Sequence, residues 1–376
     1  MLGTKAVEGL SLDVSARSED VIVSTEAFAK MTFLRLLKIN SLPISFGLLR
    51  NLEDLSLAGR REELPSKSFF SFFSSWVSPK SAGSSTFLPA TFSHLSSLTS
   101  LNLRNRNLSN KDISIDFGSF PLLKVLNLNG NKFCSLPVGI SNHSSLTRLH
   151  LSDCKNLQSI PELPPELRQF EAKCCTSIVE YPKLSNTQRK LSQFITTNCS
   201  NRIDIEEWDL PQFSLPRSYF HWTDSRGIFK SKQKYLEACV PAREVPDWCD
   251  YKATGSSSVL ICMPSLASGE RLGMILWVVC GINEEYYYNG SSTSAAFTIL
   301  FRNKTKGCEA FDEPMPEYDG GIDEDHAWAA YLRYFIFEDI NADEGDEIEV
   351  SFEAQGRSLV KKWGIHLPID RVDGIC

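Results

Sequence analysis

The fold of the first half of the chain can be predicted from nine residues, Leu123-Lys124-Val125-Leu126-Asn127-Leu128-Asn129-Gly130-Asn131. Its pattern is Leu-x-x-Leu-x-Leu-x-x-Asn, and in later copies the last position is taken by Cys. Those copies end at Cys154, at Cys175 and, in degenerate form, at Cys199. Shorter matches begin upstream at Leu98, Leu52 and Leu34, with Leu10-Ser11-Leu12 as the expected first strand.

Equivalent residues recur at a steady interval. The steps are 25 residues from Leu101 to Leu126, then 23, 21 and 24 to Leu149, Phe170 and Phe194. Intervals of this length are typical of leucine-rich repeats. The step from Leu55 to Leu101 is 46, or two periods, so we interpret the Ser/Phe-rich stretch 66–85 as a loop or a decayed repeat. The sequence predicts an α/β leucine-rich-repeat solenoid, a short horseshoe, over residues 1–200.

The repeat gives each residue type a role. The Leu-x-Leu core is expected to form a short parallel strand whose leucines point inward, while alternate side chains line the concave face. The Asn or Cys that follows turns inward and satisfies backbone groups left unpaired as the chain leaves the strand. This accounts for Asn131, Cys154, Cys175 and Cys199, whereas Arg106 at the matching place predicts an irregular turn.

Zinc ligation is the alternative for Cys154, Cys174, Cys175 and Cys199. Zinc sites usually use close pairs such as Cys-x-x-Cys, and three of these thiols fall on the repeat phase. The total of 11 cysteines is odd and forms no paired framework, which fits reduced thiols. We therefore expect structural cysteines, no metal, no cofactor and no catalytic residue.

Charge divides the chain. Residues 241–376 carry 24 acidic and 11 basic side chains, a net charge of −13, whereas residues 1–240 carry 22 and 28, a net charge of +6. Such a shift marks a domain boundary, and an acidic domain is unsuited to nucleic acid. The N-terminus lacks a signal-peptide pattern. The longest apolar run, 273–282, is about half of the roughly 20 residues that a membrane-spanning helix needs. We expect a cytoplasmic protein that contacts no membrane, with the nucleus as an alternative location.

Beyond a linker at 201–235, the pattern becomes that of strands separated by Gly, Pro and acidic clusters. We expect strands at 258–263, 273–282, 295–301, 331–337, 346–352 and 363–367. Many strands with polar turns and almost no helical period predict an all-β antiparallel sandwich over residues 236–376.

Three features of this half suggest other chemistry. The acidic clusters 309–325 and 338–349 suggest calcium, but their spacing does not fit an EF-hand loop, so we interpret them as solvated hairpin tips. His326 beside Asp325 suggests acid–base chemistry, but no nucleophile motif accompanies it, so we expect a structural hydrogen bond. The run Tyr286-Tyr287-Tyr288 is typical of an interface anchor, with ordinary packing as the alternative.

The sequence resembles that of a known family. Gly9-Leu10-Ser11-Leu12-Asp13 and Ala27-Phe28-Ala29-Lys30-Met31 look like the opening of the repeats in plant TIR-type nucleotide-binding leucine-rich-repeat disease resistance receptors. The closing repeats of those receptors are similar to Leu157-Gln158-Ser159-Ile160-Pro161. The jelly-roll/Ig-like domain that follows them is similar, at its start and end, to Val240-Pro241-Ala242-Arg243-Glu244-Val245-Pro246-Asp247-Trp248 and Lys361-Lys362-Trp363-Gly364-Ile365-His366-Leu367.

The resemblance implies recognition without catalysis. The sequence contains no phosphate loop of the form Gly-x-x-x-x-Gly-Lys-Ser/Thr and no TIR domain. We therefore expect no nucleotide switch, no enzymatic activity, and no oligomerisation in the absence of those N-terminal domains. The implied partner is a protein, either a pathogen effector or a host protein, which contacts the concave repeat face and loops of the sandwich.

Strand alternation names the candidate contact residues. They are Lys38, Asn40, Ser56, Asn102, Arg104, Asn127, Asn129, Arg148, His150, Ser152, Glu171 and Lys173, together with Tyr286, Tyr287 and Tyr288. The alternative for each is solvated surface, because typically under about 30% of contacting residues carry the binding energy. Three other interpretations stay open. They are an adaptor or decoy scaffold that uses the same surface, a carbohydrate-binding sandwich with an aromatic groove near Trp328, and a truncated product without a role of its own.

Overall fold

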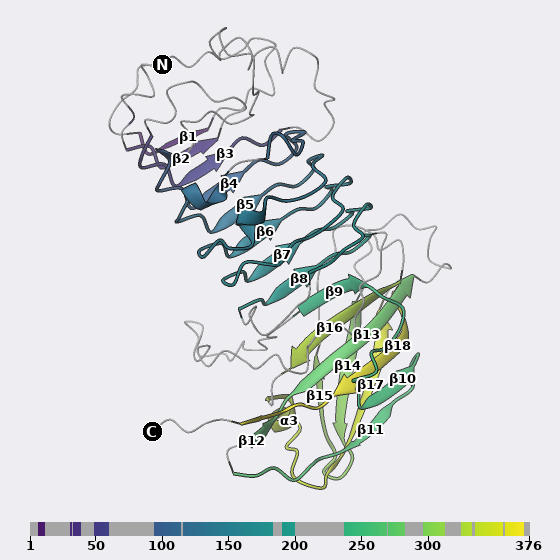
Figure 1. The fold of residues 1–376 in the computed structure, drawn as a ribbon. Coiled ribbons are helices and arrows are strands. Elements are labelled where there is room, and N and C mark those ends of the chain that lie inside the picture. Colours follow the sequence, from purple (N-terminus) through teal and green to yellow (C-terminus); the bar gives the residue numbers. More distant parts are fainter. Residues whose placement is uncertain are drawn as a thin grey trace. The chain divides into compact units, whose positions relative to one another are not determined.

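The computed structural model describes residues 7–11, 31, 33–38, 49–59, 94–113, 116–182, 190–199, 237–268, 270–282, 296–312, 325–332, 335–355 and 358–371. The chain divides into two compact units. The first comprises residues 1–182 with 199–201, and the second comprises residues 183–198 with 202–376. Figure 1 labels the strands of both units.

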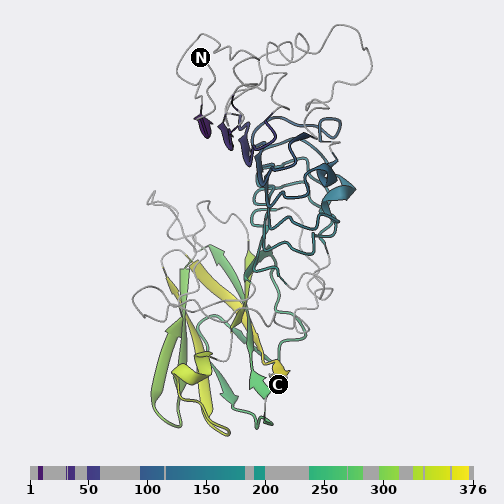
Figure 2. The same cartoon turned by 90° about the vertical axis from the view of Figure 1, so that its left-hand side faces the viewer.

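The first unit is a stack of short parallel strands (Figures 1 and 2). Among its described residues, seven strands of three residues each pair with their neighbours in chain order. They are β1 (Gly9–Ser11), β2 (Leu36–Lys38), β3 (Asp54–Ser56), β4 (Ser100–Asn102), β5 (Val125–Asn127), β6 (Arg148–His150) and β7 (Gln169–Glu171). In each strand the central residue is buried and its two neighbours are at least partly exposed.

The register stacks the central residues into one apolar column. Leu101 pairs with Leu126, Leu126 with Leu149, and Leu149 with Phe170, and all four are at most 1% exposed. Burying one such side chain contributes roughly 2 kcal/mol. The predicted repeat phase is therefore confirmed as the interior of a solenoid.

The step of 46 residues from Leu55 to Leu101 spans one rung of the sheet, because β3 pairs directly with β4, Leu55 with Leu101. The stretch 66–85, which we interpreted as a loop or a decayed repeat, lies outside the described residues. The side opposite the strands carries 3₁₀ turns, η3 (Phe117–Ser119) and η4 (Val138–Ile140), and the described part of this unit contains no α-helix (Figure 2). Copies of 21–25 residues leave a return segment that is short for an α-helix, which averages roughly 10–14 residues.

The buried side chain of Asn131 stabilises the turn that follows β5 by hydrogen bonds to the backbone. It is 2% exposed, and its Nδ2 donates to the carbonyl oxygens of Leu103 at 3.0 Å and Leu128 at 2.7 Å. Its Oδ1 accepts the backbone N–H groups of Arg106 at 3.1 Å and Leu108 at 3.0 Å. One amide thus satisfies four backbone groups on two rungs, as the repeat pattern predicts.

The cysteines at the same position make fewer hydrogen bonds than Asn131. Each thiol donates to a carbonyl of the preceding rung, at 3.3 Å for Cys154, 3.1 Å for Cys175 and 3.1 Å for Cys199. Burial raises the pKa of the Cys154 thiol to about 12, so the thiol stays neutral and keeps its proton for this bond. The predicted structural role of these three residues is confirmed.

A residue in the left-handed backbone conformation precedes each Asn or Cys position. These residues have φ values of 55° at Asn105, 69° at Gly130, 61° at Asp153 and 57° at Cys174. Gly, Asn and Asp adopt this region most readily, which explains their presence at this place in the repeat. Cys174 departs from that preference at a cost of about 1 kcal/mol.

The second unit contains two larger sheets and a two-stranded pair. One sheet has the order β8-β9-β16-β13-β18-β10 and the other has β11-β17-β14-β15, while β12 pairs with β19. All pairs are antiparallel except β8 with β9. The strands are β8 (Gln193–Ile195), β9 (Glu237–Pro241), β10 (Tyr251–Thr254), β11 (Val259–Cys262), β12 (Glu270–Leu272), β13 (Met274–Ile282), β14 (Ala296–Asn303), β15 (Cys308–Asp312), β16 (His326–Leu332), β17 (Glu347–Gln355), β18 (Ser358–His366) and β19 (Ile369–Arg371).

Side chains from the two larger sheets share one core. Phe297 on β14 packs against Trp328 on β16 with ring centroids 5.3 Å apart, and Phe352 on β17 packs against Trp363 on β18 at 4.7 Å. All four side chains are at most 3% exposed. Each such ring pair adds about 0.5–1.5 kcal/mol beyond its burial, so an acidic domain is held together from an apolar interior.

The segment after β9 is fastened against β18. A side chain at Gly364 would place its Cβ 2.5 Å from Cγ1 of Val245 and 2.8 Å from Sγ of Cys249. The Nζ of Lys362 donates to the carboxylate of Glu244 at 2.6 Å. The stretch that resembles the start of the family's C-terminal domain therefore contacts the stretch that resembles its end.

One predicted strand is displaced. We expected a strand at 331–337, whereas β16 ends at Leu332 and residues Phe335–Asp339 form the short helix α3. β16 reads His-Ala-Trp-Ala-Ala-Tyr-Leu and is buried along its whole length. Alanine has a low strand propensity, so this segment shows no strand pattern and becomes a strand because β9 and β13 pair with it on both sides.

We predict that Asn131→Ala lowers the free energy of unfolding by about 3 kcal/mol, because it leaves buried N–H and C=O groups without partners. Cys154→Ala removes a single thiol bond and is expected to cost about 1 kcal/mol. Urea denaturation followed by circular dichroism measures both, with the exposed Lys132→Ala as the control. Equal losses for Asn131→Ala and Cys154→Ala would contradict the assigned roles.

We predict that Gly364→Ala destabilises the second unit by about 2 kcal/mol, since the added methyl group overlaps Val245 and Cys249. Gly139→Ala is the matched control, because a Cβ there meets no heavy atom within 4 Å. Differential scanning calorimetry compares the two variants with the parent chain. An unchanged melting temperature for Gly364→Ala would show that β18 and the segment after β9 are not packed as described.

Candidate functional site: the strand face of the repeats

Three columns of side chains form the exposed face of the parallel sheet, which we call the strand face. The strand register defines these columns. The first column holds the residue before each stacked central residue, and the second holds the residue after it. The third holds the residue two places further along, which follows the second leucine of the Leu-x-Leu core or its equivalent. From β2 to β7 the columns are Leu36, Asp54, Ser100, Val125, Arg148 and Gln169; Lys38, Ser56, Asn102, Asn127, His150 and Glu171; and Ala58, Arg104, Asn129, Ser152 and Lys173.

The predicted concave residues fall in these columns, apart from Asn40, which lies outside the described residues. Their role in binding stays a prediction. Tyr286, Tyr287 and Tyr288 also lie outside the described residues.

Four polar side chains of the strand face serve the backbone. Asn102 and Asn127 each accept a hydrogen bond from the backbone N–H two residues later, at 3.1 and 3.0 Å. Asn129 and Ser152 each accept the backbone N–H of a residue on the next rung, at 2.8 and 3.1 Å. The acceptor atoms of these side chains therefore hold the sheet together and are not offered to a partner.

The carboxylate of Glu171 on β7 lies between two basic side chains, His150 on β6 and Lys173. The Oε2 of Glu171 lies 3.0 Å from Nδ1 of His150, and its Oε1 lies 2.7 Å from Nζ of Lys173. The hydrogen bond from His150, followed by that from Lys173, lowers the pKa of Glu171 to about 2. The Glu171 carboxylate is charged at neutral pH and is compensated by its two neighbours.

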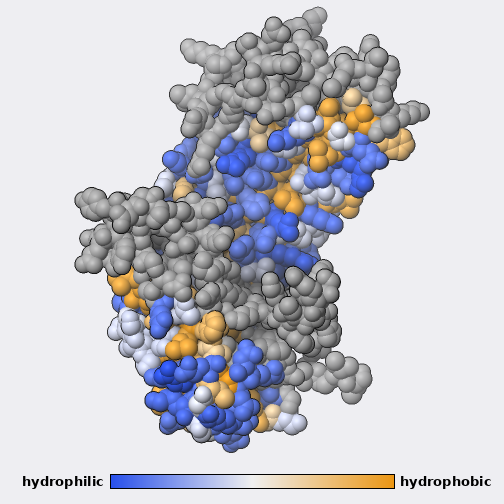
Figure 3. Space-filling view, turned by 180° about the vertical axis from the view of Figure 1, so that it is seen from behind, coloured by the Kyte–Doolittle hydropathy of each residue, from blue (hydrophilic) through white to orange (hydrophobic). Residues whose placement is uncertain are grey.

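The remaining cations of the strand face are exposed. Lys38, Arg104 and Arg148 form no ion pair with any residue of the described ranges. Figure 3 views the strand face and shows it as mostly hydrophilic across the described repeats. These three side chains keep their full donor capacity for a partner.

Our prediction from sequence missed most of one column. Asp54, Ser100, Val125 and Gln169 precede the stacked residues and lie on the strand face, as does Leu36, which is 46% exposed. The Leu-x-Leu motif draws attention to the residue between the leucines. Period-two alternation carried one residue further back would have identified this column.

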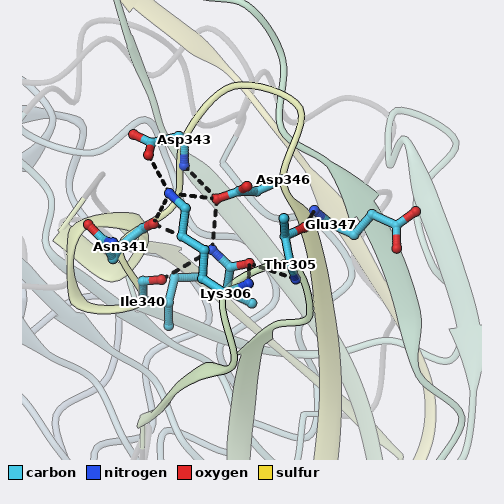
Figure 4. Close-up of polar contacts among 8 residues, drawn as sticks. Thr305, Lys306, Ile340, Asn341, Asp343, Asp346 and Glu347 are labelled. Carbon is cyan, nitrogen blue, oxygen red and sulfur yellow. Dashed lines mark hydrogen bonds and ion pairs between the residues drawn. The ribbon is translucent and has the colours of Figure 1, made fainter.

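The ammonium group of Lys306 lies among the oxygen atoms of the acidic loop after α3 (Figure 4). Oδ2 of Asp346 accepts hydrogen bonds from the N–H of Asp343 and Nδ2 of Asn303, both at 2.9 Å. Nζ of Lys306 lies 3.0 Å from the same oxygen, donates to the carbonyl oxygen of Asn341 at 2.8 Å, and pairs with Asp343. The N–H of Asp343, then the Asn303 amide and the Lys306 ammonium, lower the pKa of Asp346 to about 2.

The interpretation of this loop as a solvated tip is therefore wrong for Asp346, which is 5% exposed. The side chain is drawn inward because Asn303 and Lys306 on the neighbouring hairpin supply donors. The Lys306 ammonium stands among the oxygens where a calcium interpretation would place the metal. Glu344 is exposed, as expected, and residues 313–324 of the other acidic cluster lie outside the described ranges.

The structure places the other two candidates, His326 and Trp328, in the interior of the second unit. His326 is 1% exposed, and its Nε2 accepts the backbone N–H of Asn198 at 2.9 Å, which confirms the expected structural hydrogen bond. Trp328 is 3% exposed in the core and cannot line an aromatic groove. Within the described ranges, no group of three or more His, Cys, Asp or Glu side chains is placed to hold a metal ion.

Glu171 makes the stability of the solenoid depend on pH. Its pKa lies below the ordinary value of 4.5, so its contribution is complete above about pH 5 and is lost as the pH falls toward 2. We predict that Glu171→Gln is less stable than the parent chain by roughly 1 kcal/mol at pH 7 and equally stable near pH 2. Urea denaturation at several pH values measures this.

Glu162→Gln is the control for this experiment, since Glu162 is an exposed acid outside the strand face. A stability difference between Glu171→Gln and the parent chain that stays constant from pH 7 to pH 2 would contradict the role of Glu171.

The chain is similar to plant disease resistance proteins. Disease resistance protein RPS4 of Arabidopsis thaliana is 27% identical over 275 residues, which cover 66% of this chain and 22% of RPS4. TMV resistance protein N of Nicotiana glutinosa is 36% identical over 103 residues, which cover 27% of this chain and 9% of that protein. The chain thus spans about a fifth of the length of the first of these curated relatives.

Other comparisons add less. No family model matches the chain. A leucine-rich-repeat protein of Leptospira interrogans aligns with a TM-score of 0.25 and 19% identity over 43% of this chain and 47% of that chain, a likeness too low to support an argument. Among the described residues, no helix has the length and apolar character needed to cross a membrane. The repeats and the sequence matches agree: the homologues of this chain are plant TIR-type nucleotide-binding leucine-rich-repeat disease resistance proteins, over the region that contains the repeats.

Proposed function

We propose that the chain is a protein-recognition module of a plant immune receptor, whose strand face binds a pathogen effector or a host protein without catalysis. The single observation that carries this proposal is the set of exposed cations, Lys38, Arg104 and Arg148, on a face where Asn102, Asn127, Asn129 and Ser152 are engaged within the sheet. The backbone of a stacked sheet is already ordered before a partner binds, so the ordering cost of binding is confined to the side chains, which favours affinity.

Three further parts of the proposal rest on the resemblance and the relatives. The second unit is proposed to be the jelly-roll/Ig-like domain that follows the repeats in this family, and its loops, with Tyr286–Tyr288, are proposed to contribute to binding. The module is proposed to act in the cytoplasm or the nucleus. It is proposed to require no cofactor, nucleic acid or membrane, and not to oligomerise in the absence of the N-terminal domains of the family.

The alternatives have unequal support. An adaptor or decoy scaffold uses the same strand face, and the identity of the captured protein distinguishes it from an effector receptor. A carbohydrate-binding groove would need Trp328 at the surface, and this residue is in the core. No observation favours the carbohydrate-binding alternative.

Site-specific photo-crosslinking tests the proposed surface. A benzophenone amino acid at Gln169, on the strand face, is expected to give discrete protein adducts in leaf cells challenged with a pathogen. The same amino acid at Leu122, which is 50% exposed outside the three columns, is the matched control. Adducts of equal yield at both positions, or none at Gln169, would show that the strand face is not the binding surface.

A further inference from the structure

We infer that the strand face binds an acidic segment of its protein partner across β4, β5 and β6. This inference rests on the proposed function of the strand face as a protein-binding surface. It adds the chemical character of the segment that is bound and the rungs that it occupies.

The inference starts from donors that the solenoid does not use. Arg104 and Arg148 are exposed, and within the described ranges neither forms an ion pair. Asn127 lies between them, one rung and one column from each. Its Oδ1 is committed to the N–H of Asn129, and its Nδ2 donates no hydrogen bond to any residue that the structure describes. Guanidinium groups and an amide NH₂ that donate no bond within the described residues can donate hydrogen bonds to the oxygen atoms of a ligand.

The three donors form a diagonal whose length limits the ligand. Strands lie about 4.8 Å apart and residues rise about 3.3 Å along a strand, so Arg104 and Arg148 have backbones about 16 Å apart, with Asn127 midway. An extended segment of roughly five residues spans this distance. Carboxylates near the two ends of such a segment match the forked donors of the two arginines.

The acids of the strand face do not compete for these arginines. Asp54 lies on β3, outside the diagonal, and Glu171 on β7 is already held by His150 and Lys173. Lys38 and Asp54 on one side, and Glu171 and Lys173 on the other, therefore flank β4, β5 and β6, where Arg104 and Arg148 are the charged Arg, Lys, Asp or Glu residues of the three columns. Charge complementarity then selects an acidic ligand and sets its position along the rungs.

A protein segment fits this region better than nucleic acid. Two cations over three rungs neutralise few phosphates, whereas nucleic-acid sites depend on many. The columns of the strand face contain no Phe, Tyr or Trp residue, so the large aromatic platforms on which single-stranded bases usually stack are missing from them. Carboxylates presented by an extended peptide are the acceptors that remain.

The test measures binding of a defined peptide to the full chain. A fluorescein-labelled peptide Gly-Ser-Glu-Asp-Gly-Glu-Asp-Ser-Gly is followed by fluorescence anisotropy at low salt, beside a peptide in which Gln and Asn replace the acids. The acidic peptide is expected to bind at least tenfold more tightly than the amide peptide. Arg104→Glu with Arg148→Glu is expected to weaken its binding at least tenfold, with circular dichroism unchanged.

The matched control is Lys132→Glu with Lys155→Glu. These are exposed cations outside the strand face, so the net charge changes equally, and binding is expected to stay within twofold. Three results would overturn the inference: no binding of the acidic peptide, equal weakening by both double variants, or tighter binding of an eight-nucleotide single-stranded DNA. If one of these results is obtained while Gln169 still gives protein adducts, the inference fails and the proposed function stands.

Discussion

Each rung of the solenoid depends on the burial of one side chain between its two neighbours. Strands of three residues make too few hydrogen bonds to be stable alone, so the stack exists because Leu101, Leu126, Leu149 and Phe170 exclude water from a continuous column. The turns that follow require an inward polar group, and Asn131 supplies four hydrogen bonds where the thiols supply one or two. The later rungs are therefore held more by packing than by turn bonds.

The burial of the central column also determines which side chains lie on the strand face. Side chains that alternate with the buried column must face outward, but Asn102, Asn127, Asn129 and Ser152 also complete the backbone of the sheet. If the strand face binds a protein as we propose, specificity rests on the side chains that the sheet does not use, chiefly the exposed cations Lys38, Arg104 and Arg148. A surface of this kind changes its ligand when few residues change, because the rungs themselves are untouched.

The second unit combines an acidic sequence with a large apolar core. Its apolar residues from both larger sheets meet inside, while its carboxylates are drawn into local contacts with cations from distant strands. Lys306 joins the loop after α3, and Lys362 joins the segment after β9. Such pairs contribute modestly to stability when exposed, but each one fixes a loop against a strand. The pair of Lys362 with Glu244 places the stretches that resemble the start and the end of the family's C-terminal domain in contact.

Period and residue type were enough to place the repeats, the stacked leucines and the inward Asn and Cys positions, because a repeating interval leaves one phase that buries the leucines. Alternation likewise placed the candidate residues on the strand face. The sequence could not say that Asn129 and Ser152 accept bonds from the next rung, that Glu171 is held by His150 and Lys173, or that Asp346 is buried. Nor could it place β16, whose alanines carry no strand signal. Each depends on residues brought together from different rungs or hairpins, and only the tertiary structure sets those distances.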